Sequence, residues 1–363
     1  MVDSSFKDND HSTKELFLSG AIWNDLDSNG DTPGCLAWKL GERGRGIYEL
    51  CVNAGVRAEM LLGLMGGYEE LGSEGDEEDE EIPDADASAE VGEDGEMNGT
   101  NGTNGTHEHE LAVGPAEQTE IQKEKKDVNS EDYLKSELKF EDDKLLDEDD
   151  NGVMMKWETD IMRKSVDLLI PDLKPGDRVL NIGFGMGIID RMFRDTKPKS
   201  HYIIEAHPAV LAKLAEPESA FGKNWEENAP EGGKYKIHAG KWQDVCPKLL
   251  EGGEVFDAIY FDTFGEDYSQ LKLFFTEYVS GLLDGEGRFG FFNGLGADRR
   301  VCYDVYTKVA ELDLCDAGMD VEWTDVEVPI EGMEQAGEGE WTGVRRRYWT
   351  LDKYRLPICT FLG

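Results

Sequence analysis

The sequence lacks any closely spaced pair of cysteines. Its six cysteines are scattered from Cys35 to Cys359, with no CxxC motif and no Cys/His cluster at zinc-ligand spacing. This pattern argues against a metal site and fits reduced thiols. We therefore expect no metal, and a location in the cytoplasm and the nucleus.

Positive charge is missing from a long stretch of the chain. No Lys or Arg occurs from Ala58 to Gln122, while Glu69 to Glu96 is densely acidic, and the formal net charge of the chain is −41. Such a segment repels itself and buries too little apolar surface to offset the entropy of ordering. We predict a disordered acidic linker over residues 72–129, with a docking tail for a basic partner as the alternative. Phosphate repulsion opposes direct binding of nucleic acid.

The sequence also lacks an apolar run long enough to span a bilayer, and its polar start, MVDSSFKDND, does not read as a signal peptide. We expect no membrane partner. The three glycosylation sequons in NGTNGTNGT are therefore interpreted as low-complexity linker.

The segment before the linker, residues 1–71, resembles a degenerate ankyrin repeat. Thr32-Pro33 stands where the first helix of such a repeat opens, and Ala54-Gly55 stands where its second helix ends. One repeat cannot bury its own face, so the preceding ELFLSGAIWNDLDSNG is expected to stack on it. The alternative is a plain helical hairpin with the same turn residues.

The segment after the linker, residues 130–363, alternates strand-like and helix-like stretches. Strands are expected at Arg178–Ile182, His201–Glu205, Lys234–His238, Phe256–Asp262, Gly287–Asn293, Val321–Val328 and Val344–Leu351. Steady alternation with helices predicts an α/β fold with a parallel sheet covered on both faces. The last two strands have no long helix between them, which predicts an antiparallel final strand. This is the seven-stranded, mostly parallel sheet of class I S-adenosylmethionine-dependent methyltransferases, with a ligand at the carboxyl end of the first strand.

A glycine corner follows that first strand. Gly183, Gly185 and Gly187 give G-x-G-x-G, which is neither the dinucleotide motif nor a P-loop. Glu205 ends the next strand, where a carboxylate can accept both ribose hydroxyls. The pair indicates an adenosine cofactor, and it leaves NAD, S-adenosylmethionine and a purely structural strand–helix corner open.

Six stretches then identify a family resemblance. VMMKWETDIM, VLNIGFGMGII, HYIIEAH, GKWQDV, FDAIYFDTF and FFNGL occur in the order found in guanidinoacetate methyltransferases. Over roughly Tyr133 to Pro357 the chain most resembles the fungal protein-arginine N5-methyltransferases (type IV), in which ankyrin-like repeats also precede the catalytic domain.

The resemblance implies S-adenosylmethionine as the cofactor and assigns residues to it. Asn181 departs from the pattern, because many relatives carry an acidic residue there, so the contact to the amino end of the cofactor is expected to be neutral. Taken alone, the methionines would be read as core residues beside an amphipathic helix. The implied cofactor-binding residues are Tyr133, Met154, Met162, Phe184, Gly185, Met186, Gly187, Ile188, Ile189, Glu205, Ala206, His207, Trp242, Gln243 and Asp262.

Methylation of a guanidinium requires groups that hold its planar fork, and carboxylates do this because each can accept two parallel N–H bonds. Glu158 and Asp262 match the guanidino-binding carboxylates of the resembling family and are the candidate catalytic residues. Glu158 alone could instead be a helix-start carboxylate, and Asp262 a loop cap. Asn293, Gly294 and Leu295 follow another strand and are expected to shape the substrate pocket.

The sequence is compatible with three functions. The sequence lacks the Thr-His-Trp motif of common arginine methyltransferases, and this absence argues against methylation of an ω nitrogen. The resemblance then implies methylation of the internal δ nitrogen (N5) of an exposed arginine in a protein, namely a large-subunit ribosomal protein. The alternatives are a small-molecule methyltransferase of the guanidinoacetate type and a non-catalytic acidic adaptor.

Overall fold

The computed structural model describes residues 4–73, 130–171 and 176–363. Residues 1–64 and 128–363 belong to one compact unit, to which this description refers, while residues 65–127 form a second unit. The predicted linker, 72–129, lies outside the described residues except at its first two positions, which end helix α3. Within the described residues, no helix is both long and apolar enough to cross a membrane.

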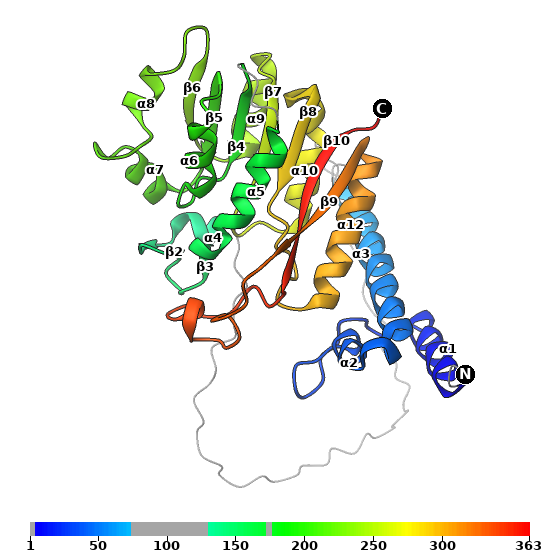
Figure 1. The fold of residues 1–363 in the computed structure, drawn as a ribbon. Helices are drawn as coiled ribbons and strands as arrows, with labels where there is room; N and C mark the ends of the chain where they lie inside the picture. The colour runs from blue at the N-terminus through cyan, green and yellow to red at the C-terminus, as the bar shows by residue number, and fades with distance from the viewer. Residues whose placement is uncertain (1–3, 74–129, 172–175) are drawn as a thin grey trace, which may run out of the picture. The chain divides into compact units, whose positions relative to one another are not determined.

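A seven-stranded sheet organises the main unit (Figure 1). Its strand order is β6-β5-β4-β7-β8-β10-β9. Strands β4, β5, β6, β7 and β8 pair in parallel, and β10 is antiparallel to both of its neighbours. The strands are β4 Arg178–Ile182, β5 Ser200–Glu205, β6 Lys234–Ala239, β7 Phe256–Phe261, β8 Leu283–Phe291, β9 Met319–Glu327 and β10 Lys353–Phe361.

Helices cover both faces of this sheet, as expected for strands that are apolar on both sides. The cluster on one face takes its residues from α5, α6 and α7, and the cluster on the other takes them from α9, α10, α11 and α12. The central strand RVLNI is buried from Val179 to Ile182, so β4 carries its glycine corner on a rigid support. The helices are α5 Thr159–Leu169, α6 Ile188–Asp195, α7 Pro208–Leu214, α8 Lys223–Glu227, α9 Trp242–Glu251, α10 Tyr268–Glu277, α11 Val279–Leu282 and α12 Arg300–Asp316.

The expected strand at Val344–Leu351 was wrong. These residues are irregular and follow a short 3-10 helix, η3 Gly339–Trp341, and the last strand is β10. Two tryptophans, Trp341 and Trp349, are fully buried in the irregular stretch. The apolar residues there therefore pack inward as loop anchors and do not alternate across a sheet.

A small three-stranded sheet, which was not predicted, precedes the main one in the order β1-β2-β3. It brings Met154 and Val153, on its last strand, to the glycine corner. Its strands are β1 Lys139–Phe140, β2 Lys144–Leu146 and β3 Gly152–Met155, with α4 Ser130–Lys135 before them and the 3-10 helix η2 Lys156–Glu158 after them.

The N-terminal helices pack on α12. Thr32 caps α2 by accepting a bond from the Cys35 backbone N–H, and Pro33 occupies the first turn, as expected. The expected helix end at Ala54-Gly55 was wrong, because α3 continues to Ser73. A Cβ on Gly55 would lie 2.6 Å from Val305 Cγ2, so this glycine permits close helix packing. The repeat identity stays a prediction. The helices are α1 Ser4–Leu18, α2 Pro33–Lys39, η1 Gly41–Arg43 and α3 Arg45–Ser73.

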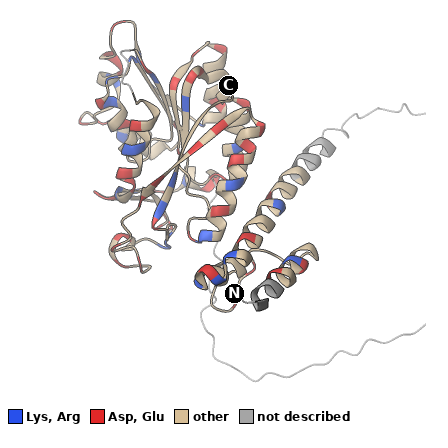
Figure 2. Cartoon of the chain, turned by 45° about the vertical axis from the view of Figure 1, so that its right-hand side comes forward, with Lys and Arg blue, Asp and Glu red and all other residues tan. Residues whose placement is uncertain are grey.

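Charge is distributed over these elements without a basic face in the view shown. Figure 2 shows Lys and Arg interspersed with Asp and Glu along the helices and strands. That distribution agrees with the expectation of no direct contact to nucleic acid, which stays a prediction.

Candidate active site

The glycine corner after β4 is built from left-handed backbone. Gly183, Gly185 and Gly187 have φ angles of 92°, 54° and 68°, a region that glycine adopts without strain. A Cβ on Gly183 would lie 1.8 Å from the carbonyl oxygen of Asp262. The corner therefore packs directly against the end of β7, which brings Asp262 beside it.

Glu205 closes the corner from the end of β5. Its carboxylate accepts backbone N–H bonds from Phe184 at 2.9 Å, Gly185 at 3.3 Å and His207 at 2.6 Å. Burial raises the pKa of Glu205, and these backbone bonds oppose the rise. The amide bonds fix the orientation of the carboxylate: Oε2 accepts two of them and Oε1 accepts one, so Oε1 keeps accepting capacity toward a ligand.

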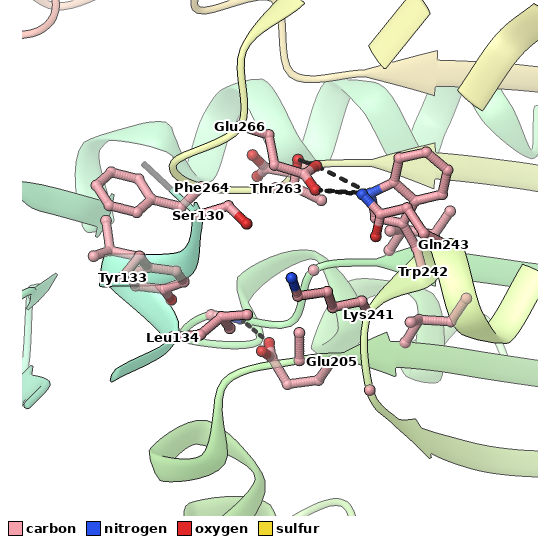
Figure 3. Close-up of a pocket in the computed structure, with 18 of the residues that line it drawn as sticks. Ser130, Tyr133, Leu134, Glu205, Lys241, Trp242, Gln243, Thr263, Phe264 and Glu266 are labelled. Atoms are coloured by element: carbon pink, nitrogen blue, oxygen red, sulfur yellow. Dashed lines mark hydrogen bonds between the residues drawn. The ribbon is translucent and has the colours of Figure 1, made fainter. Parts of the chain in front are cut away.

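A first cavity opens beside Glu205 (Figure 3). Tyr133 of α4 lies at one end with its ring 4.9 Å from that of Phe264, edge to face. At the other end Glu266 accepts bonds from the Trp242 indole N–H at 3.0 Å and the Gln243 amide at 2.8 Å. The cavity thus offers aromatic walls and a carboxylate to one elongated ligand.

Eight of the residues predicted to bind the cofactor line this first cavity. The structure brings them together from six separate segments, which supports the assignment. They are Tyr133, Met154, Gly185, Glu205, Ala206, Trp242, Gln243 and Asp262.

The other seven predicted residues lie behind the cavity wall. Phe184 packs under the corner, where a Cβ on Gly187 would meet its ring at 2.3 Å. The Met186 backbone N–H points to the Met154 sulfur at 3.2 Å. These positions shape the corner from behind and do not line the cavity. The full set outside the lining is Met162, Phe184, Met186, Gly187, Ile188, Ile189 and His207.

His207 has a defined structural task. Its Nδ1 accepts a bond from the Ala209 backbone N–H at 3.1 Å, and its Nε2 donates to the Tyr133 carbonyl at 3.0 Å. Burial lowers the pKa of His207, so the neutral ring makes both bonds. It therefore ties α4, and with it the Tyr133 ring, to the start of α7.

Asn181, the departure from the family pattern, also lies outside the cavity. Its side-chain amide donates to the Gly183 carbonyl at 2.9 Å and to Asp190 at 2.7 Å. Asp190 in turn contacts His201 at 2.9 Å. This buried network holds the corner and the start of α6 together.

A second cavity adjoins the first and shares Val153, Asp262, Thr263, Phe264 and Glu266 with it. Its other lining residues are Asn151, Gly152, Glu158, Phe261, Gly265, Asp267, Leu271, Phe292, Gly294, Leu295, Arg346 and Tyr348. Both candidate catalytic carboxyls, Glu158 and Asp262, face this space. Asp262 belongs to both cavities and therefore stands where two ligands would meet.

The two carboxyl groups carry strongly shifted pKa values. Burial raises the pKa of Glu158 to about 8, helped by the nearby Asp262, and burial raises the pKa of Asp262 to about 7. Glu158 stands at the N-cap of α5, where the helix-start alternative places it, but its side chain makes no capping hydrogen bond. It instead accepts a bond from the Tyr348 hydroxyl. Two neighbouring carboxyls with raised pKa values favour a cationic ligand between them.

The predicted substrate-binding residues fall into two groups, those that line the second cavity and one that does not. Gly294 and Leu295 line the second cavity, whereas Asn293 does not and is buried. The Asn293 amide donates to the hydroxyls of Tyr303 at 3.2 Å and Thr307 at 3.3 Å. Asn293 therefore anchors the lining loop from behind.

Sequence reasoning missed four lining side chains, Tyr348, Arg346, Glu266 and Lys241. Tyr348 and Arg346 lie in the stretch that was read as a strand. Glu266 fixes both Trp242 and Gln243. Figure 3 shows Lys241 between Glu205 and Glu266. Its position directly before the predicted Trp242-Gln243 pair was the one available signal.

Strand β10 lies second from the edge of the sheet and is antiparallel to both of its neighbours. This strand order places the chain in the class I methyltransferases. A family model described as guanidinoacetate N-methyltransferase matches residues 124–294. A protein named protein arginine N-methyltransferase 2 from Neurospora crassa is 60% identical over 351 residues, which cover 96% of this chain and 81% of that protein. The protein of the same name from Gibberella zeae is 57% identical over 350 residues, 96% of this chain and 77% of that protein. The chain belongs to this family of protein arginine N-methyltransferases.

Solved structures give a weaker likeness. Aeropyrum pernix fibrillarin with natively bound S-adenosyl-L-methionine shows 16% identity and a TM-score of 0.34, covering 56% of this chain and 76% of that one. Human methyltransferase-like protein 13 in complex with SAH shows 17% identity and a TM-score of 0.38, covering 56% and 82%. The fold class therefore rests on the strand order.

The first cavity fits S-adenosylmethionine. Glu205 offers a carboxylate acceptor for the ribose, Trp242 and Gln243 line the opposite part of the cavity, and the glycine corner lets a ligand approach the backbone. Family membership together with this fold confirms S-adenosylmethionine as the expected cofactor. Among the described residues no cluster of His, Cys, Asp or Glu could hold a metal ion.

Proposed function

We propose that this protein methylates the internal δ nitrogen (N5) of arginine in a protein substrate, and that the substrate is a large-subunit ribosomal protein. The single observation that carries the proposal is the pair of carboxyls, buried Glu158 and half-buried Asp262, in a cavity that shares lining residues with the first cavity. Arginine methylation follows from the family. The N5 position and the ribosomal substrate rest on the family resemblance and on the missing Thr-His-Trp motif.

The chain would act mainly by holding the guanidinium. S-adenosylmethionine, when bound, supplies an electrophilic methyl group. Glu158 clamps one edge of the planar fork, and its hydrogen bond from Tyr348 keeps the carboxylate in place. Asp262, at the border of the two cavities, orients the nitrogen that is methylated.

Proton release also falls to Asp262. Methylation of a guanidinium nitrogen that keeps the cation releases one proton. Burial raises the pKa of Asp262 to about 7, so its carboxylate can accept that proton near neutral pH. A cation bound beside either carboxyl lowers both pKa values, so the bound state holds the two groups ionised.

A second candidate function is methylation of a small guanidino acid. Arg346 is exposed and lines the second cavity, where its charge could pair with the carboxylate of guanidinoacetate. Against it stands the N-terminal helical segment packed on α12, which a metabolite does not need.

We propose the cytoplasm and the nucleus as locations, because a ribosomal protein is accessible in both.

One experiment separates these functions. The protein is incubated with methyl-labelled S-adenosylmethionine, ribosomal proteins and guanidinoacetate, and labelled products are hydrolysed and analysed by mass spectrometry. We expect a single methyl group on the internal nitrogen of a protein arginine. Labelled creatine would favour the second candidate, ω-methylarginine would overturn the N5 assignment, and absence of transfer would favour the adaptor.

A further inference from the structure

A buried polar network runs from the N-terminal helices to the loop Asn293–Leu295, here called the substrate loop. At its outer end the Tyr48 hydroxyl of α3 donates to Asp304 of α12. Asp304 also pairs with the Arg355 guanidinium of β10 at 2.8 Å. One carboxylate thus joins a helix of the N-terminal segment to the last strand of the sheet.

The inner half of the network ends on the substrate loop. The Arg355 backbone N–H donates to the Tyr303 hydroxyl at 2.8 Å, and the Arg355 carbonyl accepts from the Asn293 amide at 3.2 Å. That amide also donates to the Tyr303 hydroxyl at 3.2 Å. Arg355 therefore bonds to Asp304 through its side chain and fixes Asn293 through its backbone.

We infer that Tyr48 and Asp304 are positioning residues, through which the N-terminal helices set the substrate loop for binding of the arginine substrate. Asn293 and Tyr303 are almost fully buried, so their polar groups have no water to replace a lost partner. Such a network admits few arrangements, and a change at one end is passed along it. The loop lines the second cavity and not the first, so the effect falls on substrate and spares the cofactor. The kinetic part of this inference rests on the proposed function.

The same helix interface offers a matched control. The Tyr306 hydroxyl of α12 contacts Glu59 of α3 at 3.4 Å. Like Tyr48, Tyr306 bridges the two helices through a phenol hydroxyl, but the partner of its hydroxyl is Glu59 and not a member of the network. Tyr48→Phe and Tyr306→Phe each remove one hydroxyl from this interface, and only the first touches the network.

The test combines hydrogen exchange with kinetics on the full chain. We expect Tyr48→Phe to speed amide exchange in the peptide that contains residues 293–297, and Asp304→Asn to speed it further, while Tyr306→Phe leaves it unchanged. We expect KM for the arginine substrate to rise about five-fold in Tyr48→Phe, the change that corresponds to one lost hydrogen bond. The turnover number and the Kd for S-adenosylmethionine should stay within about two-fold of the wild-type values.

Two results would overturn the inference. One is exchange at residues 293–297 in Tyr48→Phe and Asp304→Asn that matches the wild type. The other is an equal response of Tyr48→Phe and Tyr306→Phe, which would mean general loosening of the interface. The exchange measurement needs no substrate, so it decides the inference even if the wild-type protein fails to methylate arginine.

Discussion

One wall of the first cavity, the glycine corner after β4, is backbone held by a single carboxylate, whereas the two candidate catalytic carboxyls of the second cavity are side chains from distant segments. In the first, Gly183 to Gly187 and Glu205 lie within two neighbouring strand ends and bond through amides. In the second, Glu158, Asp262 and Tyr348 come from η2, the end of β7 and an irregular stretch near the end of the chain. Ligand binding at a wall of backbone depends on glycine and tolerates exchange of side chains. Ligand binding by carboxyl side chains depends on their individual charges.

The largest effect is expected at the charges of the second cavity. Glu158→Gln and Asp262→Asn keep the shape and remove charge complementarity to a guanidinium. We expect turnover to fall about a hundred-fold or more in each, because orientation and charge matter most in the transition state. The double variant should lose less than the product of the two, since either loss lets the fork rotate. Steady-state kinetics with an arginine substrate measure this.

A nearby acid provides the control. Asp160 lies two residues after Glu158 in the first turn of α5 and is exposed. The Asp160→Asn variant should therefore have the turnover number of the wild type. Near-normal turnover of Glu158→Gln and Asp262→Asn would remove both residues from the mechanism. Cofactor affinity should barely change in Glu158→Gln, because Glu158 lines only the second cavity.

A smaller effect is expected for backbone shape in the first cavity. Gly185 has a φ of 54°, and a Cβ there would lie 2.8 Å from Met154 Cε. Valine adopts this conformation poorly. We expect Gly185→Val to weaken binding of S-adenosylmethionine at least ten-fold by calorimetry. Gly285→Ala serves as the matched control, because a Cβ at Gly285 meets nothing within 4 Å. Equal affinity in both variants would contradict a backbone-built cofactor cavity.

The smallest effect concerns pH and stability. Burial and Asp262 raise the pKa of Glu158 from 4.5 to about 8. The folded state therefore keeps a proton that the unfolded chain loses, so this stabilisation is complete below about pH 4.5 and is lost as the pH rises through about 8. We expect the free energy of unfolding to fall by on the order of a few kcal/mol over that window.

The comparison variant for this effect is Glu158→Gln, which has no proton to lose. Thermal unfolding at pH 6 and pH 9 should show a smaller fall in Tm for the variant than for the wild type. An arginine-containing peptide should flatten the wild-type dependence, because its guanidinium pairs with the ionised carboxylates. Parallel pH profiles for both proteins would count against the shifted pKa.

The local features of the fold could be predicted from the sequence. Strands β4 and β5 lie where they are expected, because an apolar run bounded by turn residues marks each of them within a few residues. The cofactor side followed for the same reason, since its corner and Glu205 are 22 residues apart in a fixed supersecondary unit. The expected roles of all these side chains stay predictions.

The distant features could not be predicted. The last strand was missed because Pro357 lies inside it, and a proline normally argues against a strand in a sheet interior. Tyr348 reaches Glu158 across 190 residues of sequence, and no local pattern encodes such a contact. Gly55 was read as a helix end because its real partner, Val305, lies far along the chain.

The position of β10 has a consequence for the order in which parts of the protein fold during synthesis. This strand is the last in sequence among the described residues, yet it lies inside the sheet between β8 and β9. Its Tyr354 hydroxyl accepts the Asn293 backbone N–H at 2.9 Å. During synthesis on the ribosome, β4, β5 and the glycine corner emerge long before residues 353–361 do. The glycine corner can therefore form on the nascent chain, while the loop Asn293–Leu295 of the second cavity gains its anchor only after β10 has left the exit tunnel.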